Sequence, residues 1–473
     1  MKQETVVLIV GAGPAGIATS ACLNLKNVPN IVLERDDSFA SSWRKSYDRL
    51  KLHLASQFCE LPYMSFPPNS PTFMSKNSFL EYLGSYVSHF NVNPLYKRAV
   101  EFAFFDKVDC KWHVKAMNIE KNVVENYVAR YLVVATGENS EGFVPKIEGL
   151  DGFGGKIMHS CEYRNGKSFE DKDVLVVGCG NSGMEIAYDL SNWGARTSIV
   201  VRSAVHVLTK EMVQMGMFLL KYIPCSIVDQ MVMMLSKLTH GDLSVFGLDR
   251  PNNGPFYLKK TTGRSPVIDV GTVDKIKQEE IKILPSIKKI KGNYVKFTDD
   301  KRQRFDALVF ATGYKSTVTK WLKDDGVLFN ESGKPKKRSP CHWKAEKGIY
   351  CVGFAGAGLF GISTKNIAED IRGVFRDSKG EWIAGFSGNA HASSPLHTEL
   401  VALYERLQMA NSRKFFPLEI ETDSTEVIEC LANGRDTHSA TIYRFVNLLV
   451  VLLDNINSTT VVRKEVDARY CNI

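Results

Sequence analysis

Residues 6–25 read VVLIVGAGPAGIATSACLNL, an apolar run that leads into three closely spaced glycines and then a second apolar stretch. This order predicts a buried strand, a tight turn and a helix. Gly11 permits the turn, Gly13 lets the backbone approach a pyrophosphate, and Gly16 lets the helix pack on the strand. The turn therefore predicts a dinucleotide site made by Gly11, Ala12, Gly13, Pro14, Ala15 and Gly16.

An acid follows this turn at the distance expected for a nucleotide site. The next apolar strand, IVLE at 31–34, ends in Glu34, twenty-three residues after Gly11. A carboxylate at this place accepts hydrogen bonds from the ribose hydroxyls of an adenosine. We assign Glu34 and its neighbour Arg35 to the same site.

The pattern occurs a second time in DVLVVGCGNSGMEIAYDL, residues 173–190. The following strand, TSIVVR, ends in Arg202 where the first unit has an acid. A guanidinium at this position suits the 2′-phosphate of NADPH, which we prefer to the alternative of a surface arginine at a strand end. The predicted second site comprises Gly178, Cys179, Gly180, Asn181, Ser182, Gly183 and Arg202.

Both units end on the same tripeptide. The apolar strands YLVVATG at 131–137 and ALVFATGY at 307–314 each run into Ala-Thr-Gly, whose glycine lets the chain turn beside a dinucleotide. Residues 348–371 are again apolar and glycine-rich, so we expect them to return to the first unit. The expected fold is α/β, with a dinucleotide-binding domain at 151–319 inserted into another formed by 1–150 and 320–372.

Composition restricts the class of protein. A chain of 473 residues, 44% hydrophobic and 24% charged, is typical of a globular protein of about three domains. The formal charge of +8 is modest for this length. Short basic runs such as that at 288–291 are more often solvated faces than nucleic-acid sites, so nucleic-acid binding is not expected.

Ten cysteines are scattered singly, with no CxxC and no metal-ligand spacing. This distribution predicts reduced thiols and no metal site, and it disfavours the disulfide reductases, which need a cysteine pair.

The apolar segment 217–238 is interrupted by Lys221, Pro224 and Asp229, so we expect an amphipathic helical insertion rather than a membrane span. With no signal peptide visible ahead of the first strand, a cytoplasmic location is the default. The oligomeric state stays open.

A further motif lies between the two glycine turns. Phe153, Gly155, His159 and Tyr163 fit FxGxxxHxxxY and, with GAGPAG, GCGNSG and FATGY, resemble the identifying sequences of the flavin-containing monooxygenases. Taken alone, His159 would be an ordinary core or loop histidine. The stretches at 33–62 and 254–271 are similar to the plant YUCCA-type members, and the similarity extends over about residues 5–372. The sequence departs from that group at 66–76 and 358–363, where the resemblance implies that the substrate contacts the flavin.

This resemblance implies FAD in the first site and NADPH in the second, with dioxygen and a 2-oxo acid, indole-3-pyruvate, as substrates. The flavin supplies the oxygen, so no protein nucleophile is required and no catalytic residue is assigned. The alternatives are oxygenation of nitrogen or sulfur. Trp43, Arg44, Leu52 and His53 are candidates for a flavin face, with core packing as the other interpretation. Lys76 and Arg98 are candidate partners of the substrate carboxylate, against ordinary exposed charges.

The last hundred residues, 373–473, change character and resemble part of a plant RNase H-like domain. Such nucleases hold two divalent metals with a carboxylate cluster. The family pattern matches only Glu399 and Asp423. The leading acid and the final helix are missing, so we interpret the segment as a truncated, fused remnant whose two acids are relics. A nucleic-acid-binding or nuclease protein is the alternative of a different class.

Overall fold

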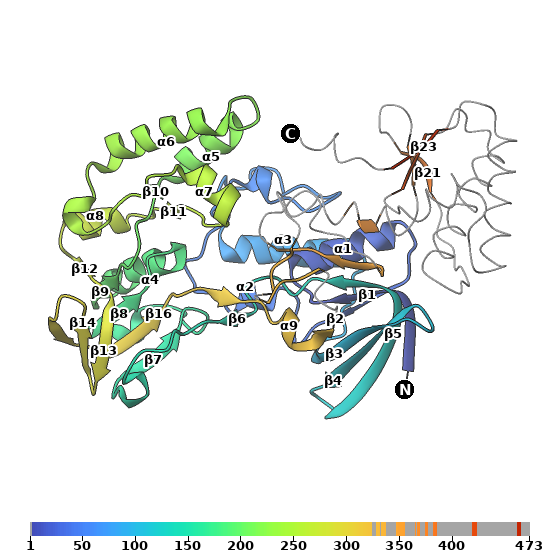
Figure 1. Ribbon diagram of the computed structural model, residues 1–473, viewed down its shortest axis with the longest axis horizontal. Helices are drawn as coiled ribbons and strands as arrows, with labels where there is room; N and C mark the ends of the chain where they lie inside the picture. Colours follow the sequence, from blue (N-terminus) through green and yellow to red (C-terminus); the bar gives the residue numbers. More distant parts are fainter. Residues whose placement is uncertain are drawn as a thin grey trace, which may run out of the picture.

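The computed structural model contains two α/β units that lie side by side, with helices above the second (Figure 1). It describes residues 2–323, 328–331, 333–336, 347–354, 365 and 367–368, together with strands at 374–376, 382–385, 419–422 and 461–464. The two-domain α/β class expected from the sequence is confirmed. The domain boundaries at 150, 319 and 372 stay predictions.

The first unit is built on a mixed sheet in the order β18-β3-β4-β5-β1-β2, with β19 also paired to β5. Along β1 the residues alternate between two cores: Val7 and Ile9 pack under the helices, and Leu8 and Val10 face the other side. The strands are β1 (Lys2–Val10), β2 (Asn30–Leu33), β3 (Arg98–Asp106), β4 (Lys111–Asn118), β5 (Val123–Val134), β18 (Leu322–Lys323) and β19 (Ile349–Cys351). The helices are α1 (Pro14–Leu25), α2 (Ser41–Arg44), α3 (Lys76–His89) and α9 (Val318–Trp321).

The first unit is not made only of parallel strands joined by helices. Strands β3, β4 and β5 form an antiparallel meander. Side chains stabilise its tight turns: Asp106 accepts a hydrogen bond from the amide of Val108, and Asn118 accepts from the amides of Glu120 and Lys121. These short polar turns leave no room for a crossover helix.

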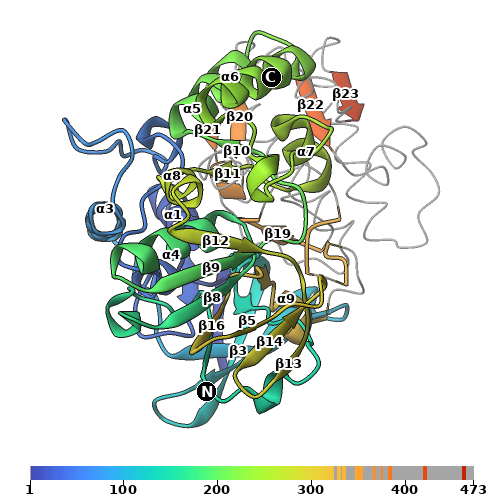
Figure 2. The same ribbon diagram turned by 90° about the vertical axis from the view of Figure 1, so that its left-hand side faces the viewer.

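The second unit contains a fully parallel sheet in the order β12-β9-β8-β16-β7. Figure 2 views the molecule from the side on which this sheet lies. Its strands are β7 (Lys156–His159), β8 (Asp173–Val177), β9 (Arg196–Val200), β12 (Ile281–Leu284) and β16 (Ala307–Phe310). Helices α4 (Asn181–Asn192) and α8 (Thr272–Lys277) accompany it. An antiparallel sheet of β13 (Ile287–Lys291), β14 (Tyr294–Phe297) and β15 (Arg302–Arg304) lies beside it.

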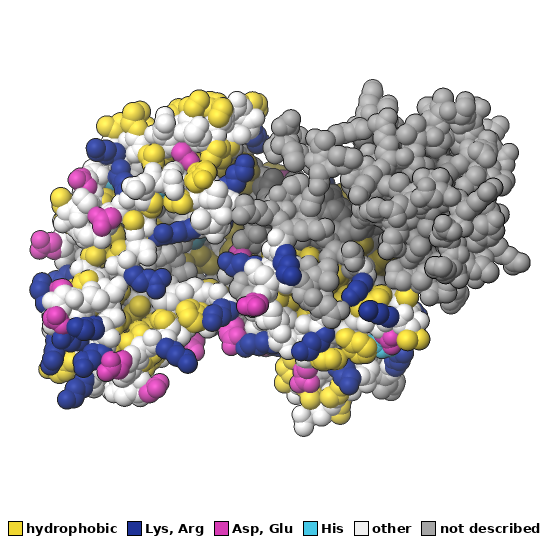
Figure 3. Space-filling view, viewed as in Figure 1, with side chains coloured by type: hydrophobic (Ala, Val, Ile, Leu, Met, Phe, Trp, Pro, Cys, Tyr) yellow, Lys and Arg dark blue, Asp and Glu magenta, His cyan; other side chains and the backbone are white. Residues whose placement is uncertain are grey.

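A helical insertion stands on the second unit. It contains α5 (Lys210–Leu219), α6 (Cys225–His240) and α7 (Pro255–Thr262), with the short pair β10 (Val207–Leu208) and β11 (Val267–Ile268). The expected amphipathic helix is thus two helices, because Pro224 caps the second. Ile227, Met231, Met234 and Leu238 form an exposed apolar face on α6, visible as yellow atoms in Figure 3. Within the described residues, no helix is long and apolar enough to cross a membrane.

Two short strands join the units. β6 (Glu141–Gly142) leaves the first unit, β17 (Tyr314–Lys315) returns from the second, and the two pair antiparallel. Nearer the carboxyl terminus, β20 (Val374–Arg376) pairs antiparallel with β21 (Trp382–Gly385), and β22 (Glu419–Thr422) pairs parallel with β23 (Val461–Lys464). Glu399 and Asp423 lie outside the described residues.

Candidate dinucleotide sites

The first glycine turn joins β1 to α1 and is closed on its inner side by the end of β5. Gly11 has φ +108°, and a Cβ there would lie 2.6 Å from the carbonyl oxygen of Ala135. At Gly16 a Cβ would lie 1.9 Å from the carbonyl oxygen of Gly11. Both positions therefore require glycine.

The second turn repeats this geometry between β8 and α4. Gly178 has φ +114°, and a Cβ there would lie 2.6 Å from the carbonyl oxygen of Ala311. At Gly183 a Cβ would lie 2.0 Å from the carbonyl oxygen of Gly178. The repeated Ala-Thr-Gly sequence has a physical explanation here, because in both units its alanine carbonyl supports the glycine turn from behind.

The outer side of each turn is open. A Cβ built on Gly13 or on Gly180 would meet no protein atom within 4 Å. These two glycines cap α1 and α4 without a side-chain hydrogen bond, so the first N–H groups of each helix face the opening. A helix N-terminus of this kind suits a phosphate. Beside the first turn, the buried hydroxyl of Thr136 has no hydrogen-bond partner among the described residues. The residues thus fit a dinucleotide at each turn.

Glu34 lies against the first turn, as the sequence predicts. The residue is only 8% exposed; Oε2 accepts a hydrogen bond of 2.7 Å from the amide of Ala12, and Oε1 accepts one of 2.9 Å from the amide of Asp36. The acid therefore also fixes the shape of the turn. Arg35 points away into solvent, since its side chain is exposed.

The side chains predicted around the second turn differ in their contacts and exposure. Asn181 uses its side-chain oxygen to accept a hydrogen bond of 2.7 Å from the amide of Ile268. Burial raises the pKa of the Cys179 thiol to about 12. Arg202 is exposed just beyond β9. Arg264, which the sequence did not single out, donates to the carbonyl of Ala204 and acts electrostatically on Cys179, so a second guanidinium lies near this turn.

Three of the four candidates for a flavin face have packing contacts within the first unit. The ring of Trp43 packs edge-on against Phe79 at 4.7 Å, and Leu52 belongs to the core of the first unit. The guanidinium of Arg44 lies 4.5 Å from the ring centroid of Phe39. For these three residues the packing interpretation describes the contacts. His53 differs, because it hydrogen-bonds to the second unit.

The two candidate partners of a substrate carboxylate already have partners of their own. Lys76 is 7% exposed rather than at the surface, and its ammonium group donates to the carbonyl of Ser46 at 2.9 Å. Arg98 of β3 donates a hydrogen bond of 3.2 Å to Glu125 of β5. Both contacts are structural.

The FxGxxxHxxxY residues lie where the two units join. His159 ends β7, its Nε2 lies 2.9 Å from the carbonyl oxygen of Gly313, and its ring packs against Tyr314 at 4.9 Å. Burial lowers the pKa of His159. Tyr163 is buried and donates to Asp189 of α4 at 2.7 Å. The motif thus supports the connecting strands and the helix that begins at the second glycine turn.

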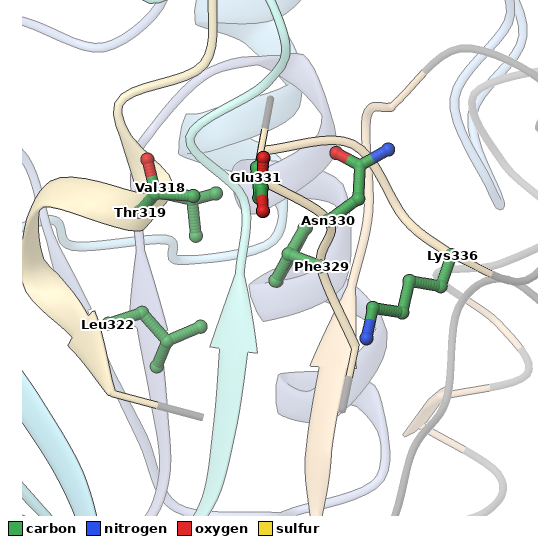
Figure 4. Close-up of a pocket in the computed structure, with 7 residues that line it drawn as sticks. All are labelled: Val318, Thr319, Leu322, Phe329, Asn330, Glu331 and Lys336. Atoms are coloured by element: carbon green, nitrogen blue, oxygen red, sulfur yellow. The ribbon is translucent and has the colours of Figure 1, made fainter. Parts of the chain in front are cut away.

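Other candidate sites are weaker. The described cysteines are all free, so no disulfide is formed among them. Within the described chain, Asp106, Asp109 and His113 form one group with metal-ligand proximity, on an exposed hairpin. A cavity of about 350 Å³ is lined by Val318, Thr319, Leu322, Phe329, Asn330, Glu331 and Lys336 (Figure 4). It lies beside β18, and Val318, Leu322 and Phe329 of its lining belong to the same core as Val10 and Val134 of the first unit.

Comparison with protein families gives two matches. Residues 4–330 match the family described as flavin-binding monooxygenase-like. Residues 358–466 match the reverse transcriptase-like family, in agreement with the RNase H-like resemblance of the tail.

Individual relatives agree with the first match. A probable indole-3-pyruvate monooxygenase of Arabidopsis thaliana, YUCCA10, is 51% identical over 381 residues, which cover 80% of this chain and all of the relative. Indole-3-pyruvate monooxygenase YUCCA1 of Oryza sativa subsp. japonica is 46% identical, covering 80% of this chain and 94% of the relative.

Solved structures agree on the fold. A flavin-containing monooxygenase from Stenotrophomonas maltophilia has a TM-score of 0.58 at 18% identity, covering 78% of this chain and 98% of that one. The bacillithiol disulfide reductase of Bacillus cereus has a TM-score of 0.56 at 19% identity, covering 78% and 98%. Because an oxygenase and a reductase match equally well, this likeness identifies the fold alone.

Proposed function

The chain belongs to the flavin-binding monooxygenase family, and we propose that it oxidatively decarboxylates indole-3-pyruvate to indole-3-acetate, a reaction of auxin biosynthesis. It is an FAD- and NADPH-dependent monooxygenase. The relatives named as indole-3-pyruvate monooxygenases supply the substrate class. The observation that carries the proposal is the pair of glycine turns, each open at Gly13 or Gly180 and closed behind by Ala-Thr-Gly.

The proposed reaction balances without a protein nucleophile. Indole-3-pyruvate, dioxygen, NADPH and a proton give indole-3-acetate, carbon dioxide, water and NADP⁺. The bound flavin supplies the redox chemistry by taking a hydride from NADPH and activating dioxygen. The protein itself binds the two cofactors and the substrate, orients them toward one another and excludes water from the site.

We assign the two cofactors to the two turns. FAD is held at residues 11–16, where Glu34 shapes the turn and the buried Thr136 hydroxyl offers a polar partner. NADPH is held at residues 178–183, where Arg202 and Arg264 provide positive charge for its 2′-phosphate. The domain division at 150, 319 and 372 and a cytoplasmic location belong to the same proposal, the latter supported by the free thiols.

The test is aerobic NADPH consumption by the purified, yellow protein, with and without indole-3-pyruvate. Indole-3-acetate and hydrogen peroxide are quantified together. We expect acetate to form in step with NADPH consumption. Hydrogen peroxide as the main product at every indole-3-pyruvate concentration would refute the substrate assignment, and oxygenation of an amine or a thioether in its place would favour the alternative chemistry.

For the tail we propose a fused remnant without nuclease activity. Residues 358–466 match a reverse transcriptase-like family, but the sequence supplies only Glu399 and Asp423 of the expected acids. Two carboxylates without the remaining acids are too few to hold two metals. Magnesium-dependent cleavage of an RNA–DNA hybrid that Glu399→Gln abolishes would overturn this proposal.

A further inference from the structure

A segment of the first unit, residues 47–54, contributes side chains to the cores of both units. Tyr47 belongs to the core of the second unit, and Leu50 packs against it. Leu52 is part of the core of the first unit, and Leu54 packs both there and on the helical insertion. This bridging segment is therefore a contact between the units in addition to β6 and β17.

The bridging segment is fixed to the first unit by its backbone. The amide of Leu52 donates to the carbonyl of Met74 at 2.8 Å, and the amide of Lys76 donates to the carbonyl of Leu50 at 2.9 Å. The buried ammonium group of Lys76 holds the carbonyl of Ser46 at the start of the segment. Side chains that leave this segment toward the second unit are consequently held in place.

Two such side chains meet Glu185, which begins the second turn of α4. Glu185 is 3% exposed, and His53 Nε2 lies 2.6 Å from its Oε1. Burial, together with the nearby carboxylate of Glu185, raises the pKa of Tyr47, so the Tyr47 side chain also acts on Glu185. From α5, the half-buried ammonium group of Lys210 also acts on Glu185. A buried carboxylate is stable only with such partners, and two of them come from the first unit.

We propose that Tyr47, His53 and Glu185 form a latch that holds the NADPH-binding turn in register with the flavin unit, so that they act as positioning residues for hydride transfer. The proposal rests on the proposed function. Ser182 and Gly183 of that turn lie within the same helical turn as Glu185, so a shift of α4 relaxes the turn itself. Hydride transfer depends steeply on donor position, and a displacement of about 1 Å costs on the order of a hundredfold in rate.

The experiment compares His53→Leu, which removes the hydrogen bond, with His53→Gln, which keeps a donor. The matched control is His113→Leu, since His113 makes a 2.7 Å contact with Asp109 on a distant hairpin. Each protein is purified with FAD, and the anaerobic rate of flavin reduction is measured over a range of NADPH concentrations. Hydrogen–deuterium exchange is measured on residues 47–54 and 181–186.

For His53→Leu we expect a saturating reduction rate lower by about tenfold to a hundredfold, with unchanged FAD content and faster exchange in both segments. His53→Gln should recover most of the rate, and His113→Leu should match the unaltered protein. Wild-type reduction together with wild-type exchange in His53→Leu would overturn the latch.

Two provisions keep the outcomes separate. If His53→Leu does not fold, Tyr47→Phe removes a hydroxyl while keeping the packed ring, and the same two measurements apply. If the unaltered protein binds FAD but NADPH does not reduce it, the proposed function fails. In that case hydrogen exchange still tests whether the latch exists, because it reports the contact between the two segments without any turnover.

Discussion

The carbonyl oxygen of Gly178 occupies the space beside Gly183 so closely that a Cβ on residue 183 would lie 2.0 Å from it. The corresponding distance between Gly11 and Gly16 is 1.9 Å. In each turn two glycines thus serve the packing of the protein, whereas the third, Gly13 or Gly180, faces open space. Substitutions can therefore separate folding from cofactor binding.

Gly180→Ala should weaken NADPH binding by about tenfold or more, or about 1.4 kcal/mol, while leaving FAD bound. The added methyl group meets no protein atom but crowds the approach of a pyrophosphate. The measurement is the dissociation constant for NADP⁺ by calorimetry, with FAD absorbance as the control. Gly13→Ala is the reciprocal variant and should lose FAD. Loss of FAD from Gly180→Ala instead would reverse the assignment of the two sites.

Arg202→Gln should raise the KM for NADPH by about tenfold and leave that for NADH unchanged, because NADH lacks the 2′-phosphate. Initial rates with both coenzymes give the ratio directly. Arg196→Gln is a suitable control, since Arg196 on β9 already pairs with Asp173. An equal loss with both coenzymes would show that Arg202 does not read the phosphate.

Glu125→Gln should destabilise the protein most at neutral pH. Burial acts to raise the pKa of Glu125, but hydrogen bonds from Tyr127, Asn118 and Arg98 outweigh it and lower the pKa to about 2, from an ordinary 4.5. The ionised form is thus favoured on folding, and its contribution is complete above pH 4.5 and lost as the pH falls toward 2. Melting temperatures of both proteins from pH 7 to 3 should converge. A constant difference would contradict the ionic role.

Tyr163→Phe should lower stability by about 1–3 kcal/mol, because Asp189 then loses one of its donors in a largely buried site. Urea unfolding followed by fluorescence measures the change. FAD content should be unaffected. A variant of unchanged stability would mean that the last residue of FxGxxxHxxxY is not needed to support α4.

Thiol reactivity should separate Cys161 from Cys179. Cys161 is exposed, whereas burial raises the pKa of Cys179 to about 12. We expect iodoacetamide at pH 8 to label Cys161 first, as read by peptide mass spectrometry, and NADPH not to reduce a disulfide dye. Rapid reduction of the dye would restore the disulfide-reductase alternative.

Local patterns made much of the fold predictable. The glycine spacing around 11–16 and 178–183 located both turns, and the repeated Ala-Thr-Gly located the strands behind them, because these features depend on backbone sterics within a short window. The meander of β3, β4 and β5 was not foreseen, since its polar turns resemble ordinary loops.

Side-chain roles were less predictable because they depend on partners far away in the chain. Lys76 and Arg98 were candidates for binding a substrate carboxylate, yet in the structure they donate hydrogen bonds to Ser46 and Glu125. His53 and Glu185 are 132 positions apart in the sequence, and no local pattern predicts their contact. Arg264 was missed for the same reason, because only the fold brings it near Cys179.

The pairing of β6 with β17 places the entrance and the exit of the inserted unit next to each other. Adjacent ends make such a unit a cassette: it can be excised, exchanged for a homologous one or acquired without rebuilding the sheet that hosts it. Residues 47–54 set the limit on that freedom, because a transplanted cassette would have to find a matching tyrosine and histidine already in its new host.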